Sequence, residues 1–180
     1  MFSAHTQLRP APDEHSPWFA GYIAAVPEGD ILQRLAGQAE ELNDVFTSIP
    51  AERLDFRYAP GKWSPLEIVG HLCDTERIMA YRALRIARAD LTPLAGFDEN
   101  AYVEAAGFGD RGLTSLLEEL RSIRVASLSL LRSFPEEAWS RRGVSNDAAV
   151  TVRALAWIIA GHANHHVSIL HQRYGLSIER

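Results

Sequence analysis

Four segments of the chain repeat their apolar side chains at the spacing of an α-helix, and this pattern most constrains the fold. The segments cover residues 30–49, 65–88, 115–133 and 151–174. In each of them apolar residues recur three or four positions apart, as they do on one face of a helix. No stretch alternates convincingly between apolar and polar residues as a half-buried strand does. Helices of about 20 residues are about 30 Å long, and four of them in one domain predict an all-α four-helix bundle.

Capping residues indicate where these helices begin and end. The run Ser64-Pro65-Leu66-Glu67 has serine at the N-cap, proline at the first helical position and glutamate at the third, and so predicts a capping box. Asp30, Thr114 and Thr151 are the N-caps that we expect for the other three helices. Gly175 is the residue expected to end the last helix.

The segments between the helices are expected to differ in character. The connection between the second and third helices, residues 90–111, is longer than most loops of compact domains, and we expect a short helix near 98–106. Residues 140–150 are expected to form an irregular loop. Residues 1–29 are rich in proline and predict an N-terminal arm. The bundle domain is then expected to cover residues 30–176.

Composition limits the classes of function that fit this chain. Its 180 residues include 18 Lys and Arg against 23 Asp and Glu, for a net charge of −5. Proteins that bind nucleic acid through its phosphates have a basic excess, so nucleic acid is not an expected partner. Apolar runs fall short of the roughly 20 residues that span a bilayer, and the N-terminus lacks a secretory signal pattern. With Cys73 as the single cysteine, we expect a cytoplasmic protein without a disulfide framework or a membrane partner.

Histidine is the residue type that points to a site. The chain has 7 histidines, and four of them lie between positions 162 and 171. His162 and His166 are four residues apart, about 40° around the helix, on a face that also carries apolar residues, so both are expected to point inward. Two such imidazoles can chelate one metal ion, and His71, on an apolar face of the second helix, could reach the same cavity. The remaining histidines are expected to lie in the arm, at the margin of the site or at the surface.

Three neutral imidazoles without a cysteinate leave coordination positions for water, which is typical of a catalytic zinc site; imidazole also suits nickel, copper or iron. The alternative for each histidine taken alone is a buried core residue. Protonation near the free imidazole pKa of about 6.5 predicts that mildly acidic buffer releases the metal.

No catalytic residue can be assigned from the sequence, but three charged residues are candidates. Glu67, one turn before His71, could be a general base, with the capping box as its alternative role. Asp74, like Thr75, could orient an imidazole or could lie at the surface. Arg124 lies among apolar residues of the third helix, where it could bind an anionic substrate group or pair with a neighbouring acid.

Several short motifs, taken in their order and spacing, resemble those of the DinB/YfiT-like proteins. The segments that resemble K-W-S and G-H-L-x-D-x-E-R of that family are Lys62-Trp63-Ser64 and Gly70-His71-Leu72-Cys73-Asp74-Thr75-Glu76-Arg77. Residues 81–88 and 93–98 are similar to the following helix end and loop. The second histidine motif is matched by Gly161-His162-Ala163-Asn164-His165-His166. The resemblance extends over roughly residues 30–175.

This resemblance implies a bundle of up-down-down-up topology and one divalent metal ion, most often nickel or zinc, held by three histidines near one end. Carried over by position, the ligands are His71, His162 and His166. The resemblance also implies a homodimer and a small-molecule substrate. Some members of the family are S-transferases that use low-molecular-weight thiols, and others are regarded as metal-dependent hydrolases.

Two classes of function therefore remain open for this sequence. The first is a metal-dependent enzyme that activates water or a thiol, for hydrolysis or S-transfer on a small electrophile. The second is a non-catalytic helical bundle that metal stabilises and that acts through protein association. Bound metal with an exchangeable water favours the first class.

Overall fold

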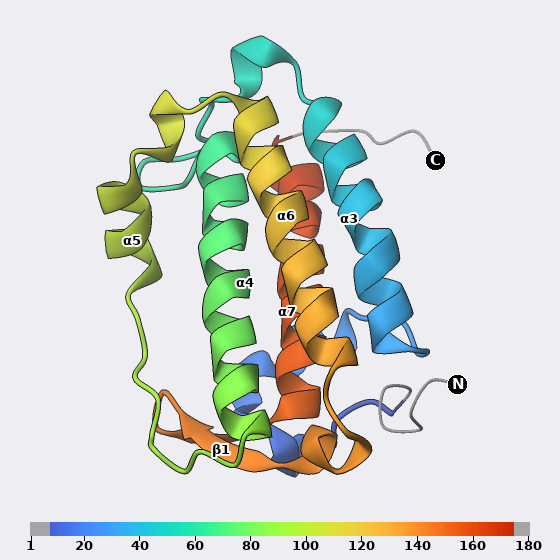
Figure 1. Cartoon of the computed structure of the whole chain (residues 1–180). Coiled ribbons are helices and arrows are strands. Elements are labelled where there is room, and N and C mark those ends of the chain that lie inside the picture. The colour runs from blue at the N-terminus through green and yellow to red at the C-terminus, as the bar shows by residue number, and fades with distance from the viewer. Residues whose placement is uncertain (1–7, 175–180) are drawn as a thin grey trace.

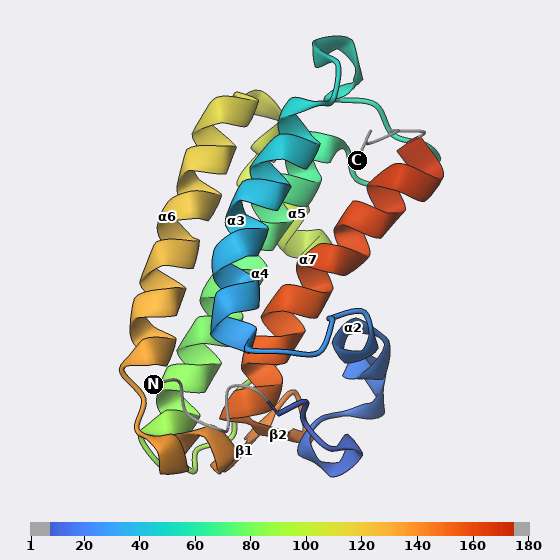
Figure 2. The same ribbon diagram turned by 90° about the vertical axis from the view of Figure 1, so that its right-hand side faces the viewer.

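The four long helices form a bundle in the computed structural model, which describes residues 8–174 (Figures 1 and 2). They are α3 (Ile31–Thr47), α4 (Pro65–Ala87), α6 (Leu113–Arg132) and α7 (Val152–Tyr174). In Figure 1, α3 and α7 run upward and α4 and α6 run downward, so the topology in chain order is up-down-down-up. Both α3 and α4 contact α6 and α7, which places the helices around the bundle in the order α3, α6, α4, α7. The predicted fold is thus confirmed.

Because α4 and α6 run in the same direction, the chain must return along the bundle between them. This connection contains the short helix α5 (Glu99–Ala106) and a 3₁₀ turn at Phe108–Asp110. The side chain of Asp98 caps α5 by accepting hydrogen bonds from the backbone amides of Asn100 and Ala101, at 2.9 and 3.1 Å. The expected short helix is confirmed, and it packs beside α4 (Figure 1).

Local side-chain chemistry explains most helix starts. In the capping box of α4, Glu67 Oε2 accepts from the backbone amide of Ser64 at 2.7 Å, and Ser64 Oγ accepts from that of Glu67 at 3.3 Å. Asp30 caps α3, and Thr151 Oγ1 accepts a hydrogen bond of 3.1 Å from the amide of Ala154 in α7.

The start of α6 differs from the sequence-based expectation. The prediction that Thr114 caps α6 is wrong, because this helix begins at Leu113, after Gly112. Leu113 packs partly buried against the core and belongs to the helix, so Thr114 falls within the first turn, where its side chain is exposed. Gly175, expected to end α7, lies outside the described residues.

The irregular loop expected at residues 140–150 is instead a β-hairpin. After a 3₁₀ turn at Glu136–Ser140, β1 (Arg142–Ser145) pairs antiparallel with β2 (Ala148–Thr151). The opposed residues are Arg142 and Thr151, Gly143 and Val150, Val144 and Ala149, and Ser145 and Ala148. Asn146 and Asp147 have φ of 50° and 58°, as a two-residue type I′ turn requires. The strands read Arg-Gly-Val-Ser and Ala-Ala-Val-Thr, without the regular alternation of apolar and polar residues that marks a strand in a sequence.

Residues 8–29 dock on the bundle rather than extend from it. They form 3₁₀ turns at Pro12–Glu14 and Pro17–Phe19 and the short helix α2 (Ala20–Ala24), which packs against α7 (Figure 2). The buried carboxylate of Glu14 accepts hydrogen bonds from Thr151 Oγ1 at 2.8 Å and Arg153 Nε at 3.1 Å, at the start of α7. A separate domain boundary after residue 29 stays a prediction.

A polar layer divides the core of the bundle into two apolar clusters. Each bundle helix contributes a buried polar residue to this layer: Gln38 from α3, Glu76 from α4, Arg124 from α6 and His162 from α7. His162, one of the candidate metal ligands, therefore lies in a zone where the core is polar. Within the described residues, no helix has both the length and the apolar character that crossing a membrane requires.

Candidate metal centre

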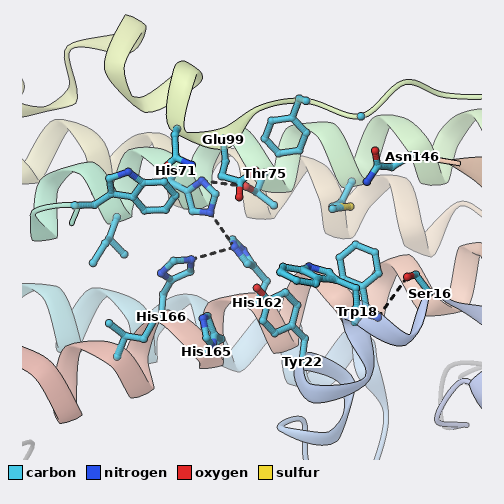
Figure 3. A pocket seen from close by; sticks show the side chains of 18 of the residues that line it. Ser16, Trp18, Tyr22, His71, Thr75, Glu99, Asn146, His162, His165 and His166 are labelled. Atoms are coloured by element: carbon cyan, nitrogen blue, oxygen red, sulfur yellow. Dashed lines mark hydrogen bonds between the residues drawn. The ribbon is translucent and has the colours of Figure 1, made fainter. Parts of the chain in front are cut away.

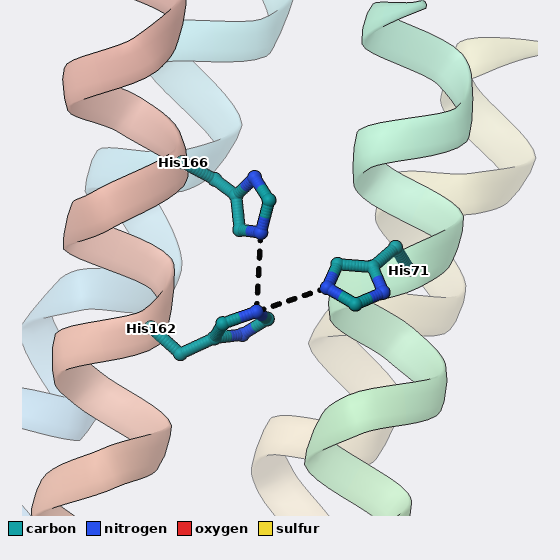
Figure 4. A group of neighbouring side chains, drawn as sticks. All are labelled: His71, His162 and His166. Atoms are coloured by element: carbon teal, nitrogen blue, oxygen red, sulfur yellow. Dashed lines mark hydrogen bonds between the residues drawn. The ribbon is translucent and has the colours of Figure 1, made fainter. Parts of the chain in front are cut away.

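Three histidines from two antiparallel helices converge between α4 and α7 (Figure 4). His71 lies in α4, and His162 and His166 lie one turn apart in α7. Nε2 of His162 is 2.9 Å from Nε2 of His71 and 3.1 Å from Nε2 of His166. One ring nitrogen from each residue lies within 4.8 Å of the other two, and all three side chains are buried. The structure thus brings together the three histidines that the sequence singled out.

The spacing of these nitrogens fits a single metal ion. Nitrogens that bind zinc at about 2.0–2.1 Å in tetrahedral geometry lie about 3.3 Å apart. The two separations from His162, 2.9 and 3.1 Å, are close to this value, and the third is within 4.8 Å. Hydrogen bonding alone fits the arrangement less well. Nε2 of a neutral imidazole carries either one proton or one lone pair, yet Nε2 of His162 faces two other nitrogens. A cation that accepts a lone pair from each residue satisfies all three.

Burial keeps the three imidazoles in the neutral form that binds metal. It lowers the pKa of His71 from 6.5 to about 4. Burial, with the neighbouring histidines as a smaller cause, holds the pKa of His162 and of His166 well below 6.5. Protonation therefore competes with metal only at lower pH than a free imidazole predicts. The pH at which metal is released therefore stays a prediction, and the burial of the ligands moves the expected pH below that of a free imidazole.

Aromatic rings and one hydroxyl hold the imidazoles in place. The ring of Trp63 lies 4.5 Å from that of His71, centre to centre, and is stacked at 6.1 Å from that of His166. Tyr22, from α2, meets the edge of His162 at 5.6 Å. Thr75 Oγ1 lies 3.5 Å from Nδ1 of His71, at the limit of a hydrogen bond. Thr75 is thus the closer of the two residues expected to orient this ring.

His165 lies beside the cluster but outside it. Its half-buried ring is 5.3 Å from that of His166 and 5.0 Å from that of Tyr22, centre to centre. His171 is exposed, and His15 hydrogen-bonds through Nδ1 to the carbonyl of Ser16 at 2.8 Å. His5 lies outside the described residues. The marginal position expected for His165 and the exposure expected for His171 are confirmed.

The three histidines line a cavity of about 490 Å³, which is within the range of small-molecule sites. Figure 3 shows it between α4 and α7, with Trp18 and Tyr22 of the N-terminal segment on one side, Glu99 of α5 on another, and Asn146 of the hairpin turn at the end away from His71 and His166. The corrected hairpin and the docked N-terminal segment therefore both belong to the wall of the site.

None of the three charged candidates lines this cavity. Burial raises the pKa of Glu67, but hydrogen bonds from Arg57 and Ser64 outweigh this effect and lower it, so its carboxylate is committed at the start of α4. Asp74 is half-buried and lies 3.8 Å from Arg77. Glu67 thus takes the capping role given as its alternative, whereas Asp74 is neither at the cavity nor fully at the surface.

Arg124 pairs with a neighbouring acid, which is the structural role that the sequence left open for it. Its Nε and Nη2 donate to the carboxylate of Glu76 at 2.8 and 2.9 Å, and its Nη1 donates to Gln38 Oε1 at 3.1 Å. Gln38 in turn donates to Asn164 Oδ1 at 2.7 Å, which turns Asn164 away from the three histidines. Arg124 is therefore part of the polar layer that supports α7.

Sequence reasoning missed Arg82, a buried residue of α4 that lines the cavity. Arg82 follows His71 by 11 residues, which is about three helical turns and about 20° around the axis. A helical projection of α4 would have placed it on the same face as His71. The sequence also showed no sign that Tyr22, in the N-terminal segment, contacts His162.

Comparison with known proteins agrees with this fold. The sequence profile of the DinB superfamily matches residues 34–170. The structure of YfiT from Bacillus subtilis matches with a TM-score of 0.71 at 19% sequence identity, over 95% of this chain and 95% of that chain. YfiT is described as a probable metal-dependent hydrolase with an unusual four-helix bundle topology. At this identity the likeness shows a shared fold. No curated protein sequence matches the chain significantly.

Proposed function

Because this chain belongs to the DinB superfamily, we propose that it is a divalent-metal-dependent enzyme that acts on a small electrophilic substrate. In this proposal His71, His162 and His166 bind the ion, with nickel or zinc as the metal, and the adjoining cavity binds the substrate. One observation supports it above the others: the three converging histidines also form part of the cavity wall. A metal ion with a purely structural role does not require an opening of this size beside its ligands.

A divalent ion held by three neutral imidazoles keeps its full charge and supplies either a bound water of lowered pKa or a bound thiolate. The protein's own residues hold the ligands neutral through burial, and the rings of Trp63 and Tyr22 pack against His71 and His162. Cys73 is buried in the core outside the cavity, and burial raises the pKa of its thiol to about 12. A thiol reaction in this site therefore needs a low-molecular-weight thiol from outside the chain.

The metal content of protein purified without a histidine tag tests the first half of this proposal. We expect about one ion per chain in the wild type and loss of that ion in His162→Ala, because removal of one of three ligands leaves a chelate too weak to survive purification. His171→Ala is the matched control, since His171 lies in the same helix but is exposed. Equal, substoichiometric metal in all three proteins would rule out the site.

Turnover of two model electrophiles tests the second half. We expect metal-dependent hydrolysis of p-nitrophenyl acetate, or metal-dependent attack of an added thiol on 1-chloro-2,4-dinitrobenzene, with loss of turnover in His162→Ala and after chelation. The thiol panel includes glutathione and cysteine. A bundle that loses thermal stability on chelation but turns over neither electrophile supports the alternative, a non-catalytic protein that metal holds together.

A further inference from the structure

Arg82 carries a buried positive charge that no described carboxylate neutralises. Its side chain is 5% exposed, and burial is the cause that lowers its pKa, without an acidic group acting on it. Nη2 donates to the carbonyl of Ala95 at 2.8 Å, and Nη1 lies 3.6 Å from Sδ of Met79. The guanidinium carbon lies 5.8 Å from the centre of the Phe97 ring. A guanidinium has five N–H donors, so these contacts leave donors free.

Arg124 shows how this fold treats a buried arginine with a structural role. That side chain is 3% exposed, and two of its nitrogens donate to Glu76 at 2.8 and 2.9 Å while Nη1 donates to the carbonyl of Leu35 at 2.8 Å. Burial of an unpaired charge is strongly unfavourable, so a counter-charge is expected wherever the arginine serves only the fold. The absence of one beside Arg82, among the described residues, indicates that its counter-charge comes from a ligand.

The position of Arg82 is consistent with a ligand that also reaches the histidines. Arg82 and His71 line the same cavity from the same face of α4, about 16 Å apart along the helix axis. Arg82 donates a hydrogen bond to the carbonyl of Ala95, in the connection between α4 and α5. This connection meets the hairpin at the preceding residue, Leu94, whose carbonyl accepts a hydrogen bond of 2.9 Å from the amide of Asn146. Figure 3 shows His71 and Asn146 toward opposite ends of the cavity.

The charges of the cavity wall also favour an anion. The buried Arg82 and the exposed Lys62 contribute two positive charges, against one negative charge from Glu99, which is also exposed. This balance is opposite in sign to the net charge of −5 of the whole chain. At the Arg82 end, Ser145 lines the cavity, and its hydroxyl makes no hydrogen bond to any described residue. A cavity lined in this way concentrates negatively charged ligands.

We propose that Arg82 binds the anionic group of an elongated ligand, a carboxylate, phosphate or sulfonate, whose other end reaches the three histidines. The histidine end of this ligand rests on the function proposed above, whereas anion binding at Arg82 does not require the metal. Arg82 is then a binding residue that selects charged substrates. The guanidinium offers a fork of donors that matches a carboxylate or phosphate oxygen pair.

A pair of fluorescent probes that differ in charge tests this proposal. 8-Anilinonaphthalene-1-sulfonate carries a sulfonate, and N-phenyl-1-naphthylamine has the same rings without it. Titration of the metal-loaded wild type, Arg82→Gln and Arg82→Lys follows the binding of each probe. We expect Arg82→Gln to weaken binding of the sulfonate about tenfold or more and to leave the neutral amine unchanged. Arg82→Lys, which keeps the charge but not the fork, is expected to fall between.

Arg88→Gln is the matched control, because Arg88 follows the same helix but is exposed outside the cavity. It should bind both probes like the wild type. In the wild type, inorganic phosphate should displace the sulfonate and not the amine, which tests the site without any substitution. Equal binding of the sulfonate by wild type and Arg82→Gln, or equal weakening of both probes, would overturn the proposal.

The same titration repeated after chelation separates this proposal from the function proposed above. In one outcome, the protein prefers the sulfonate through Arg82 even without metal and yet shows no metal-dependent turnover. That result supports the anion site and contradicts the proposed enzymatic function. In the converse outcome, the wild type shows metal-dependent turnover while Arg82→Gln changes the binding of neither probe. That result supports the enzymatic function and contradicts the anion site.

Discussion

The buried ion pair between Glu76 and Arg124 is the residue-level contact on which the polar layer depends. Both side chains are less exposed than a surface pair, at 4% and 3%, so solvent screens their attraction little. Glu76→Gln leaves the Arg124 guanidinium buried without its counter-charge. We expect it to lower the free energy of unfolding by about 3–5 kcal/mol, measured by urea denaturation.

The double variant Glu76→Gln/Arg124→Met is the control for this prediction. Because it removes the charge as well as its partner, it should recover much of the stability that Glu76→Gln loses. A loss below about 1 kcal/mol in the single variant would mean that water reaches the pair and that it behaves like an exposed one.

The depressed pKa values of the histidines predict at which pH the metal is released. The pKa of His71 is about 4 in the folded chain against an ordinary 6.5, so its neutral form persists as the pH falls through 6.5. We expect metal to remain bound after dialysis at about pH 5.5 and to be lost near pH 4, as measured by elemental analysis. Release with a midpoint near the free imidazole pKa would contradict the burial of the ligands.

The same shift fixes the sign of the stability change in metal-free protein. Histidines of the unfolded chain take up protons near their ordinary pKa of 6.5, whereas the buried ones stay neutral until about pH 4 in the case of His71. The free energy of unfolding is therefore expected to fall as the pH drops from 6.5 towards 4. Urea denaturation of chelated protein at several pH values measures this slope, and a rise in stability over that range would contradict it.

The two kinds of buried arginine also show what the sequence could predict about single residues. The histidine spacing predicted which residues share a face, because helical geometry depends only on sequence separation. The sequence pattern left the role of Arg124 open and did not single out Arg82 as a residue of the cavity. A charge partner such as Glu76, which is 48 positions away from Arg124, depends on tertiary packing, so no local pattern could assign it.

At the level of elements, the contact between α2 and α7 depends on a glycine. A Cβ at Gly161 would overlap the backbone of Tyr22, which cannot turn aside as a flexible side chain could. Gly161→Ala should therefore push α2 away from α7 and lower the free energy of unfolding by about 1–3 kcal/mol. Faster proteolysis within residues 8–29 should accompany the loss.

Gly37→Ala is the matched control for this substitution. Gly37 lies in the exposed face of α3, with nothing within 4 Å of an added Cβ. Alanine there should raise the free energy of unfolding by about 0.4–1 kcal/mol, because it restricts the unfolded chain and favours the helix. A rise in the free energy of unfolding in both variants would mean that α2 does not pack on α7 as described.

Elements were predictable from the sequence where local chemistry decides them. The capping box at Ser64 and Glu67 fixed the start of α4, since its hydrogen bonds form within four residues. The hairpin at 142–151 depends on non-local contacts instead. The amide of Leu94 donates to the carbonyl of Val144 at 2.9 Å, and Gly143 packs on Ile86. Contacts between residues so far apart in the chain cannot be predicted from local sequence propensity.

At the level of the whole molecule, helical periodicity predicted a bundle but not the direction of its helices. Apolar faces pack in either orientation, so the periodicity left open whether the helices of His71 and His162 are parallel or antiparallel. The family resemblance supplied the up-down-down-up topology that the structure confirms (Figure 1). Within it, α4 and α7 are antiparallel neighbours, so a metal ion bound to His71, His162 and His166 would join two helices that are distant in sequence.

This joining of α4 and α7 predicts that metal protects the whole fold, and Cys73 provides a reporter for it. Cys73 has no exposed surface, and burial raises the pKa of its thiol to about 12, so the folded protein offers no thiolate. Alkylation by iodoacetamide then requires unfolding. Zinc or nickel at about 100 times its Kd stabilises a protein that binds it only when folded by about 2.7 kcal/mol, which should slow alkylation about 100-fold.

His162→Ala is the control for this protection, because the added metal finds only two of its three ligands there and should not slow alkylation. Mass spectrometry of the labelled chain follows the rate in both proteins. If metal is bound by the wild type but Cys73 reacts at an unchanged rate, the thiol becomes exposed through a local opening of α4 that the bound metal does not prevent. His71 and Cys73 are two residues apart in one helix, so that result would show that the metal does not hold α4 against α7.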